Sequence, residues 1–88
     1  MQMQMNNINP NLKSTKTQVA GILDYMREGK EITSLEAVNL FGCLRLAARI
    51  ADIKRRIEGT EEYVYSRFVR VSGKNKEVKA YSIKKFQA

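Results

Sequence analysis

Histidine is absent from this 88-residue sequence, which therefore lacks the commonest general base and the commonest transition-metal ligand of proteins. Cys43 is the single cysteine, so the chain can form no internal disulfide, zinc ribbon or redox pair. Only an exposed Cys43 thiol could link two chains by oxidation. The sequence also contains no phosphate-binding loop and no cluster of metal-ligating residues. We therefore expect neither a cofactor nor an enzymatic activity.

Long hydrophobic runs are also missing, since no stretch approaches the roughly 18 apolar residues that span a bilayer. The first residues, MQMQMNNINPNLKS, lack the basic start and apolar stretch of a secretion signal. We therefore expect a cytoplasmic protein that does not act on membranes. Pro10, the only proline, and the polar residues around it predict a flexible arm over 1–13, with packing of its methionines on the domain as the alternative. Residues 14–88 are expected to form one small domain.

Three helices are predicted by the spacing of apolar residues. The first runs from Ser14 or Thr15 to about residue 28. The second, at about 34–41, begins with a T-x-x-E capping box and ends at a glycine. Periodicity then resumes and predicts a third helix at about 44–58. Two helices joined by a short glycine-containing link describe a helix-turn-helix.

A β-hairpin is predicted after the third helix. Residues 63–72 and 77–86 are rich in aromatic and β-branched side chains and flank a glycine-containing turn. A short extended segment near Ile32 could pair with the hairpin as a third strand. The fold class is therefore α+β, with the element order of a winged helix-turn-helix. The hairpin aromatics are expected in the core rather than as stacking platforms for single strands: Tyr63, Tyr65, Phe68, Tyr81 and Phe86.

The net charge of +7 is unevenly distributed. Residues 1–41 carry four basic and four acidic side chains, whereas residues 42–88 carry twelve basic and five acidic ones. The excess belongs to the third helix and the hairpin, the elements that a winged helix places against DNA. We expect double-stranded DNA as the partner and no small-molecule substrate. A protein-interaction module whose basic face binds an acidic protein is the alternative, and a homodimer is left open.

The third helix separates its apolar and basic residues onto different faces. Four large apolar residues recur at helical spacing and should face the core: Leu46, Ile50, Ile53 and Ile57. A helix in the major groove needs short side chains near the groove floor and arginines that fork onto guanine. DNA contacts are therefore expected from six residues of this helix: Arg45, Ala48, Arg49, Asp52, Arg55 and Arg56.

Asp52 also offers a different interpretation of the same face. Arg49 and Arg56 lie three residues before it and four residues after it, where each could form an ion pair on a solvated surface. DNA contact and a structural ion pair are equal alternatives for these two arginines. Arg45, near the start of the helix, is free of this acid, which favours DNA contact.

Basic residues also gather at the hairpin turn. Lys74, Asn75 and Lys76 lie at its tip, within the wing at 72–79. A phosphate backbone would supply the missing counter-charge, so we expect these residues to contact phosphates or the minor groove. The alternative is that the lysines only keep the edges of a small sheet soluble.

The stretch Ile32-Thr-Ser-Leu-Glu-Ala-Val-Asn-Leu-Phe-Gly42, followed by Arg45-Leu-Ala-Ala-Arg-Ile-Ala-Asp-Ile-Lys-Arg55, resembles small helix-turn-helix proteins of bacteriophages and prophages. These share an I-T-S-x-E-A start, an F-G turn and an R-I-x-D-[LI]-[KR] recognition helix. The resemblance covers about 17–57 clearly and the hairpin loosely. It implies a DNA-binding transcriptional regulator or excision or architectural factor of a bacterial or infected cell, with Arg45 and Arg49 facing DNA.

One departure concerns the rotation of the third helix. The general helix-turn-helix pattern, with its glycine placed on Gly42, expects buried apolar residues at positions 48 and 51. This chain has Ala48 and Ala51 there. If these alanines are buried, the face presented to DNA changes.

Overall fold

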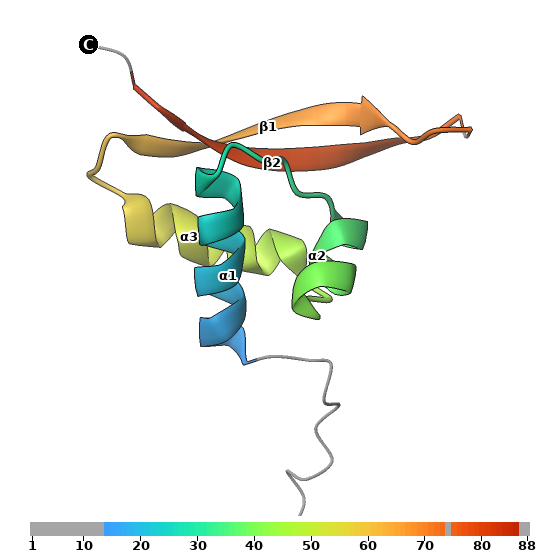
Figure 1. Ribbon diagram of the computed structural model, residues 1–88. Helices are drawn as coiled ribbons and strands as arrows, with labels where there is room; N and C mark the ends of the chain where they lie inside the picture. Colours follow the sequence, from blue (N-terminus) through green and yellow to red (C-terminus); the bar gives the residue numbers. More distant parts are fainter. Residues whose placement is uncertain (1–13, 74, 87–88) are drawn as a thin grey trace, which may run out of the picture.

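Three helices lie on one side of a long β-hairpin, whose turn projects past the second helix (Figure 1). The computed structural model describes residues 14–73 and 75–86. In chain order the elements are α1 (Thr15–Arg27), α2 (Ser34–Phe41), α3 (Leu46–Ile57), β1 (Glu62–Arg70) and β2 (Glu77–Lys85). The predicted α+β winged helix-turn-helix is confirmed. The arm predicted for 1–13 lies outside the described residues.

Local capping explains where α1 and α2 begin. The Ser14 hydroxyl accepts a hydrogen bond from the backbone N–H of Thr17 at 3.1 Å, so Ser14 is the N-cap of α1. Thr33 and Glu36 form the predicted capping box, in which each side chain accepts from the backbone N–H of the other. Gly42 ends α2 in the left-handed region, with φ of 63°, which glycine adopts without the steric cost of a Cβ.

The core joins all three helices to the residue Ile32 that precedes α2. Its buried members are Val19, Ile22, Leu23, Met26, Ile32, Ala37, Cys43, Leu46, Ile50, Ile53 and Ile57. The predicted rotation of α3 is therefore confirmed, because its leucine and isoleucines point inward. Ala51 is exposed and Ala48 half-buried, so the alternative with both alanines in the core does not occur. Cys43 is 1% exposed, so its thiol does not meet the condition of exposure that a link between two chains would need.

The sheet has β2 at its centre. β1 pairs with β2 in an antiparallel register that runs from Glu62 opposite Lys85 to Arg70 opposite Glu77. On the other edge of β2, Ile32 and Tyr81 exchange backbone hydrogen bonds of 2.8 and 2.9 Å. The third strand expected near Ile32 is thus a single bridge. It ties the segment between α1 and α2 to the hairpin.

The expectation that all five hairpin aromatics are buried was wrong. Tyr81 packs against the core, but Tyr65, Phe68 and Phe86 are 40%, 63% and 66% exposed. Successive residues of a strand point to opposite faces of a sheet, and only one face of this hairpin meets the helices. Ser66 lies opposite Tyr81 in the register, so Tyr65, the residue before Ser66, points to the other face.

Two of the exposed rings lie beside lysines, whereas the Phe86 ring lies 4.6 Å from the Tyr63 ring, centre to centre. The Nζ atom of Lys84 lies 4.9 Å from the centre of the Tyr65 ring, and that of Lys79 lies 5.6 Å from the Phe68 ring. Such cation–π contacts keep two positive charges at the surface of the hairpin. Tyr65 and Phe68 are on opposite faces, so they make no continuous stacking platform.

Candidate nucleic-acid interface

The exposed side of α3 carries cations that no acid of the described chain neutralises. Arg45 is the N-cap residue of α3, and its side chain makes no capping hydrogen bond. Lys54 and Arg56 extend from the exposed side of the last two turns. Residues 14–73 and 75–86 place no carboxylate within ion-pair distance of these three side chains. They remain available to an anionic partner.

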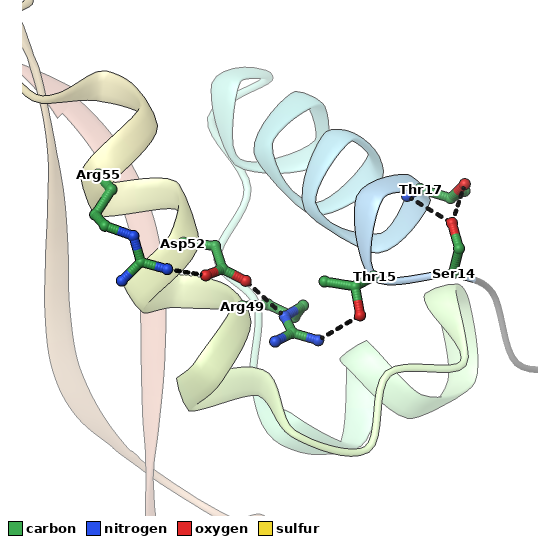
Figure 2. A network of polar contacts seen from close by, with 6 residues as sticks. All are labelled: Ser14, Thr15, Thr17, Arg49, Asp52 and Arg55. Carbon is green, nitrogen blue, oxygen red and sulfur yellow. Dashed lines mark hydrogen bonds and ion pairs between the residues drawn. The ribbon is translucent and has the colours of Figure 1, made fainter.

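Asp52 sits at the centre of a second group of charges on α3 (Figure 2). Its Oδ2 atom accepts a hydrogen bond from Nε of Arg49 at 3.1 Å, and its Oδ1 atom accepts one from an Nη atom of Arg55. Arg49 also donates from Nη1 to the hydroxyl of Thr15 at 3.2 Å. Figure 2 shows Arg49 between α3 and the first turn of α1, whereas Arg55 lies on the far side of Asp52.

This arrangement corrects one expectation about α3. Asp52 pairs with Arg49 as anticipated, but its second partner is Arg55 and not Arg56. The reason is directional, because Arg49 occupies the oxygen that faces α1. The other oxygen is left on the opposite flank, where Arg55 follows three residues later. Arg56 therefore does not form the ion pair with Asp52 that the sequence allowed.

The wing uses part of its positive charge internally. Arg70 donates to Oδ1 of Asn75 at 3.0 Å and lies 3.8 Å from a carboxylate oxygen of Glu77. Lys76 is exposed and forms no ion pair within the described part of the chain. Lys74, the other lysine expected to contact phosphate, lies outside the described residues. Asn75 therefore orients Arg70 at the turn, while Lys76 remains free for a partner.

Two bidentate ion pairs connect the helical half of the chain to the hairpin. Arg27 donates to both carboxylate oxygens of Glu62 at 2.9 and 2.7 Å, and Arg67 donates to both oxygens of Glu31 at 2.6 and 2.8 Å. These hydrogen bonds hold the pKa of Glu62 and the pKa of Glu31 below their usual range. The sequence did not indicate the Arg67–Glu31 pair, because the two residues are 36 positions apart.

A hollow of about 430 Å³ separates the first turn of α2 from the outer half of the hairpin. Its lining is mostly apolar: Thr33, Ser34, Leu35, Glu36, Val69, Val71, Lys76 and Val78. Leu35 is 70% exposed. Sequence reasoning did not anticipate this hollow, because it forms only where the twisted hairpin passes the start of α2.

Two other kinds of site are absent from the described residues. No three side chains of histidine, cysteine, aspartate or glutamate come together there as a metal site would require. None of the described helices has the length and apolar character needed to cross a membrane.

A family model described as a winged helix-turn-helix domain matches residues 17–85. The match includes α2, α3 and both strands in full, and α1 from Thr17 onward. It therefore extends over the hairpin, where the sequence motifs gave only a loose resemblance. No curated protein and no solved structure shows significant similarity to the chain. The chain belongs to the winged helix-turn-helix domain family.

Proposed function

We propose that this chain is a non-catalytic protein that binds double-stranded DNA, with α3 in the major groove. The observation that carries the proposal is the division of α3 into a buried apolar face and an exposed face whose cations Arg45, Lys54 and Arg56 lack acidic partners in the described chain. A duplex supplies closely spaced phosphates for such cations. Exposed small residues at Ala47 and Ala51 let the helix backbone approach the groove floor.

The hairpin turn would make the second contact, at phosphates or in the adjacent minor groove. Lys76 provides a point charge there, Lys74 adds a positive charge to this stretch of the sequence, and Arg70 is oriented by Asn75. Phosphate contacts of this kind fix the position of a protein on DNA without reading its sequence. Base reading is assigned to α3, where Arg45 and Arg55 can reach the edges of bases.

The biological role that we propose is that of a phage or prophage transcriptional regulator, or an excision or architectural factor. Support comes from the I-T-S-L-E-A start at Ile32, the F-G turn at Gly42 and the R-I-A-D-I-K segment that begins at Arg49. Such a protein acts where the bacterial or infected cell keeps its DNA, in the cytoplasm.

Duplex affinity at two salt concentrations tests this proposal. We expect the full chain to bind a labelled random-sequence duplex in low salt and to lose affinity steeply as salt rises, because each neutralised phosphate releases counterions. Poly-glutamate is the control for a basic face that binds acidic protein. Binding to poly-glutamate without binding to the duplex in low salt would replace the DNA proposal by the protein-interaction alternative. The number of chains bound per short duplex distinguishes a monomer from a homodimer.

A further inference from the structure

We infer that Asp52 is a positioning residue that gives the α3 surface its preference for particular DNA sequences over any phosphate backbone. It does so by restraining Arg49 and aiming Arg55. The inference rests on the proposed duplex binding and adds a role that charge alone would not suggest, since an acid on a DNA-binding face lowers its attraction to phosphate.

The geometry divides the two arginines into different roles. Arg49 donates in two directions, to Asp52 and to Thr15, and its side chain is only 18% exposed. It is held between α3 and the first turn of α1, as Figure 2 shows. The Arg55 side chain is 70% exposed and uses a single Nη atom on Asp52. Arg49 is therefore an anchor, and Arg55 is the arginine that can reach a base.

Restraint by Asp52 prepares Arg55 for base recognition. A guanidinium has five N–H donors in a fixed plane, so the bond to Asp52 leaves a free edge that can fork onto guanine. Holding the side chain in one conformation beforehand reduces the rotamer entropy lost when it meets a base. A freely moving Arg55 would instead follow the nearest phosphate, which every sequence offers.

The charge of Asp52 also acts against binding to the wrong sequence. One carboxylate is shared by two guanidinium groups, so the cluster presents one net positive charge in place of two. Its carboxylate is repelled by phosphates, which weakens complexes held only by the backbone. On a preferred sequence, bonds from Arg55 to base edges offset this repulsion. The difference in affinity between preferred and random duplexes therefore increases.

The test compares Asp52→Asn with Glu58→Gln in the full chain. Each variant removes one negative charge, Asp52→Asn from α3 itself and Glu58→Gln from its C-cap. Asp52 forms two ion pairs, whereas the Glu58 side chain forms none among the described residues. The probes are a duplex enriched from a random pool by the wild-type protein and a random-sequence duplex. We expect Asp52→Asn to raise affinity for the random duplex, steepen its salt dependence by about one unit and reduce discrimination about tenfold. Glu58→Gln should leave discrimination within about twofold of wild type.

A second variant examines the other partner of the same bond. Arg55→Gln changes an exposed side chain and should reduce discrimination without raising affinity for the random duplex. Thermal unfolding of every variant verifies that it is folded, and Arg55→Gln replaces Asp52→Asn as the deciding variant if the latter does not fold. Equal effects of Asp52→Asn and Glu58→Gln, or unchanged discrimination in Arg55→Gln, would overturn the inference while duplex binding stands. A wild-type chain that binds no duplex would overturn the proposed function instead.

Discussion

Arg67 and Glu31 join across the outer face of β2, with two hydrogen bonds of 2.6 and 2.8 Å between guanidinium and carboxylate. The register requires this crossing, because Arg67 lies opposite Ala80 on β1 and Glu31 precedes the bridge at Ile32 on the other edge. The two side chains cover the strand between them. Ala80 lies opposite Arg67 in the register and is 2% exposed on this face.

We expect Glu31→Gln to lower the thermal midpoint at neutral pH and to have no effect in strong acid. The hydrogen bonds from Arg67 lower the pKa of Glu31 in the folded chain below its ordinary value of about 4.5. The ion pair therefore stabilises the fold above that value, and the stabilisation is lost as pH falls through the lowered pKa. Thermal unfolding at several pH values between neutral and acidic should show the difference between the two thermal midpoints decreasing to zero.

Glu61→Gln is the matched control for this pH series, since Glu61 is exposed and its side chain forms no ion pair among the described residues. Its midpoint should follow that of wild type at every pH. High salt should also narrow the difference between wild type and Glu31→Gln, because the pair is partly exposed to solvent. A difference that persists unchanged into strong acid would show that packing over Ala80, and not charge, is what Glu31 contributes.

Ile53→Ala should destabilise the fold by about 2 to 5 kcal/mol, the range for emptying a buried aliphatic site. Ile53 is completely buried where α3 meets the rest of the core. Leu44→Ala provides the control, because Leu44 is 69% exposed and its replacement should cost about 0.5 kcal/mol or less. Denaturant unfolding measures both values. A cost below about 1 kcal/mol for Ile53→Ala would contradict the orientation of α3.

The helices could be predicted because their determinants are local. The capping box at Thr33, the glycine at position 42 and the spacing of isoleucines in α3 act within a few residues, so the helix bounds followed from the sequence. Burial on the hairpin could not be predicted in the same way. Alternation shows that Tyr65 and Tyr81 face opposite directions, but the extent to which the helices cover each part of the hairpin is a tertiary property.

The candidate site shows the same division. The charge of each half of the sequence assigned the basic residues to α3 and the wing. The individual partners depended on side-chain directions and on contacts between distant segments, as with Arg67 and Glu31, which are 36 residues apart. Even within α3, helical spacing permitted Asp52 to pair with either Arg55 or Arg56. The position of α1 beside Arg49 decided the outcome.

Gly21→Ala should destabilise the fold although alanine favours a helix by about 1 kcal/mol relative to glycine. A Cβ atom at position 21 would lie 2.9 and 3.0 Å from two ring carbons of Phe41, closer than nearly all real Cβ contacts. The ring also packs edge-on against Tyr25 at 5.7 Å, which limits how far it can move. We expect a cost of about 1 to 3 kcal/mol in denaturant unfolding.

The background variant Phe41→Leu isolates this contact. Leucine removes the ring carbons that oppose the new Cβ, so Gly21→Ala should become neutral or stabilising in that background. A double-mutant cycle over the four proteins gives the coupling free energy between the two positions. An equal cost of Gly21→Ala in both backgrounds would assign the effect to the backbone of α1 and not to the approach of Phe41.

Arg45→Ala and Lys76→Ala should separate base reading from phosphate contact. Arg45 lies at the start of α3, where recognition helices meet base edges, and no acid of the described chain restrains it. Its replacement should cost about 1 to 3 kcal/mol on a duplex enriched by the wild-type protein and reduce the difference from a random duplex. Lys76→Ala, at the wing, should weaken binding to all duplexes about equally and lower the salt slope by roughly one unit.

The comparison of these two variants is informative because each removes one positive charge. If electrostatics alone governed binding, both would lower affinity and salt slope alike and leave discrimination unchanged. Fluorescence anisotropy on the two duplexes at several salt concentrations measures all three quantities. Loss of discrimination in Lys76→Ala but not in Arg45→Ala would reverse the assigned roles and place sequence reading in the wing. If replacing both residues together left duplex affinity unchanged, α3 and the wing would not be the DNA-binding surface, and the acidic-protein alternative would take its place.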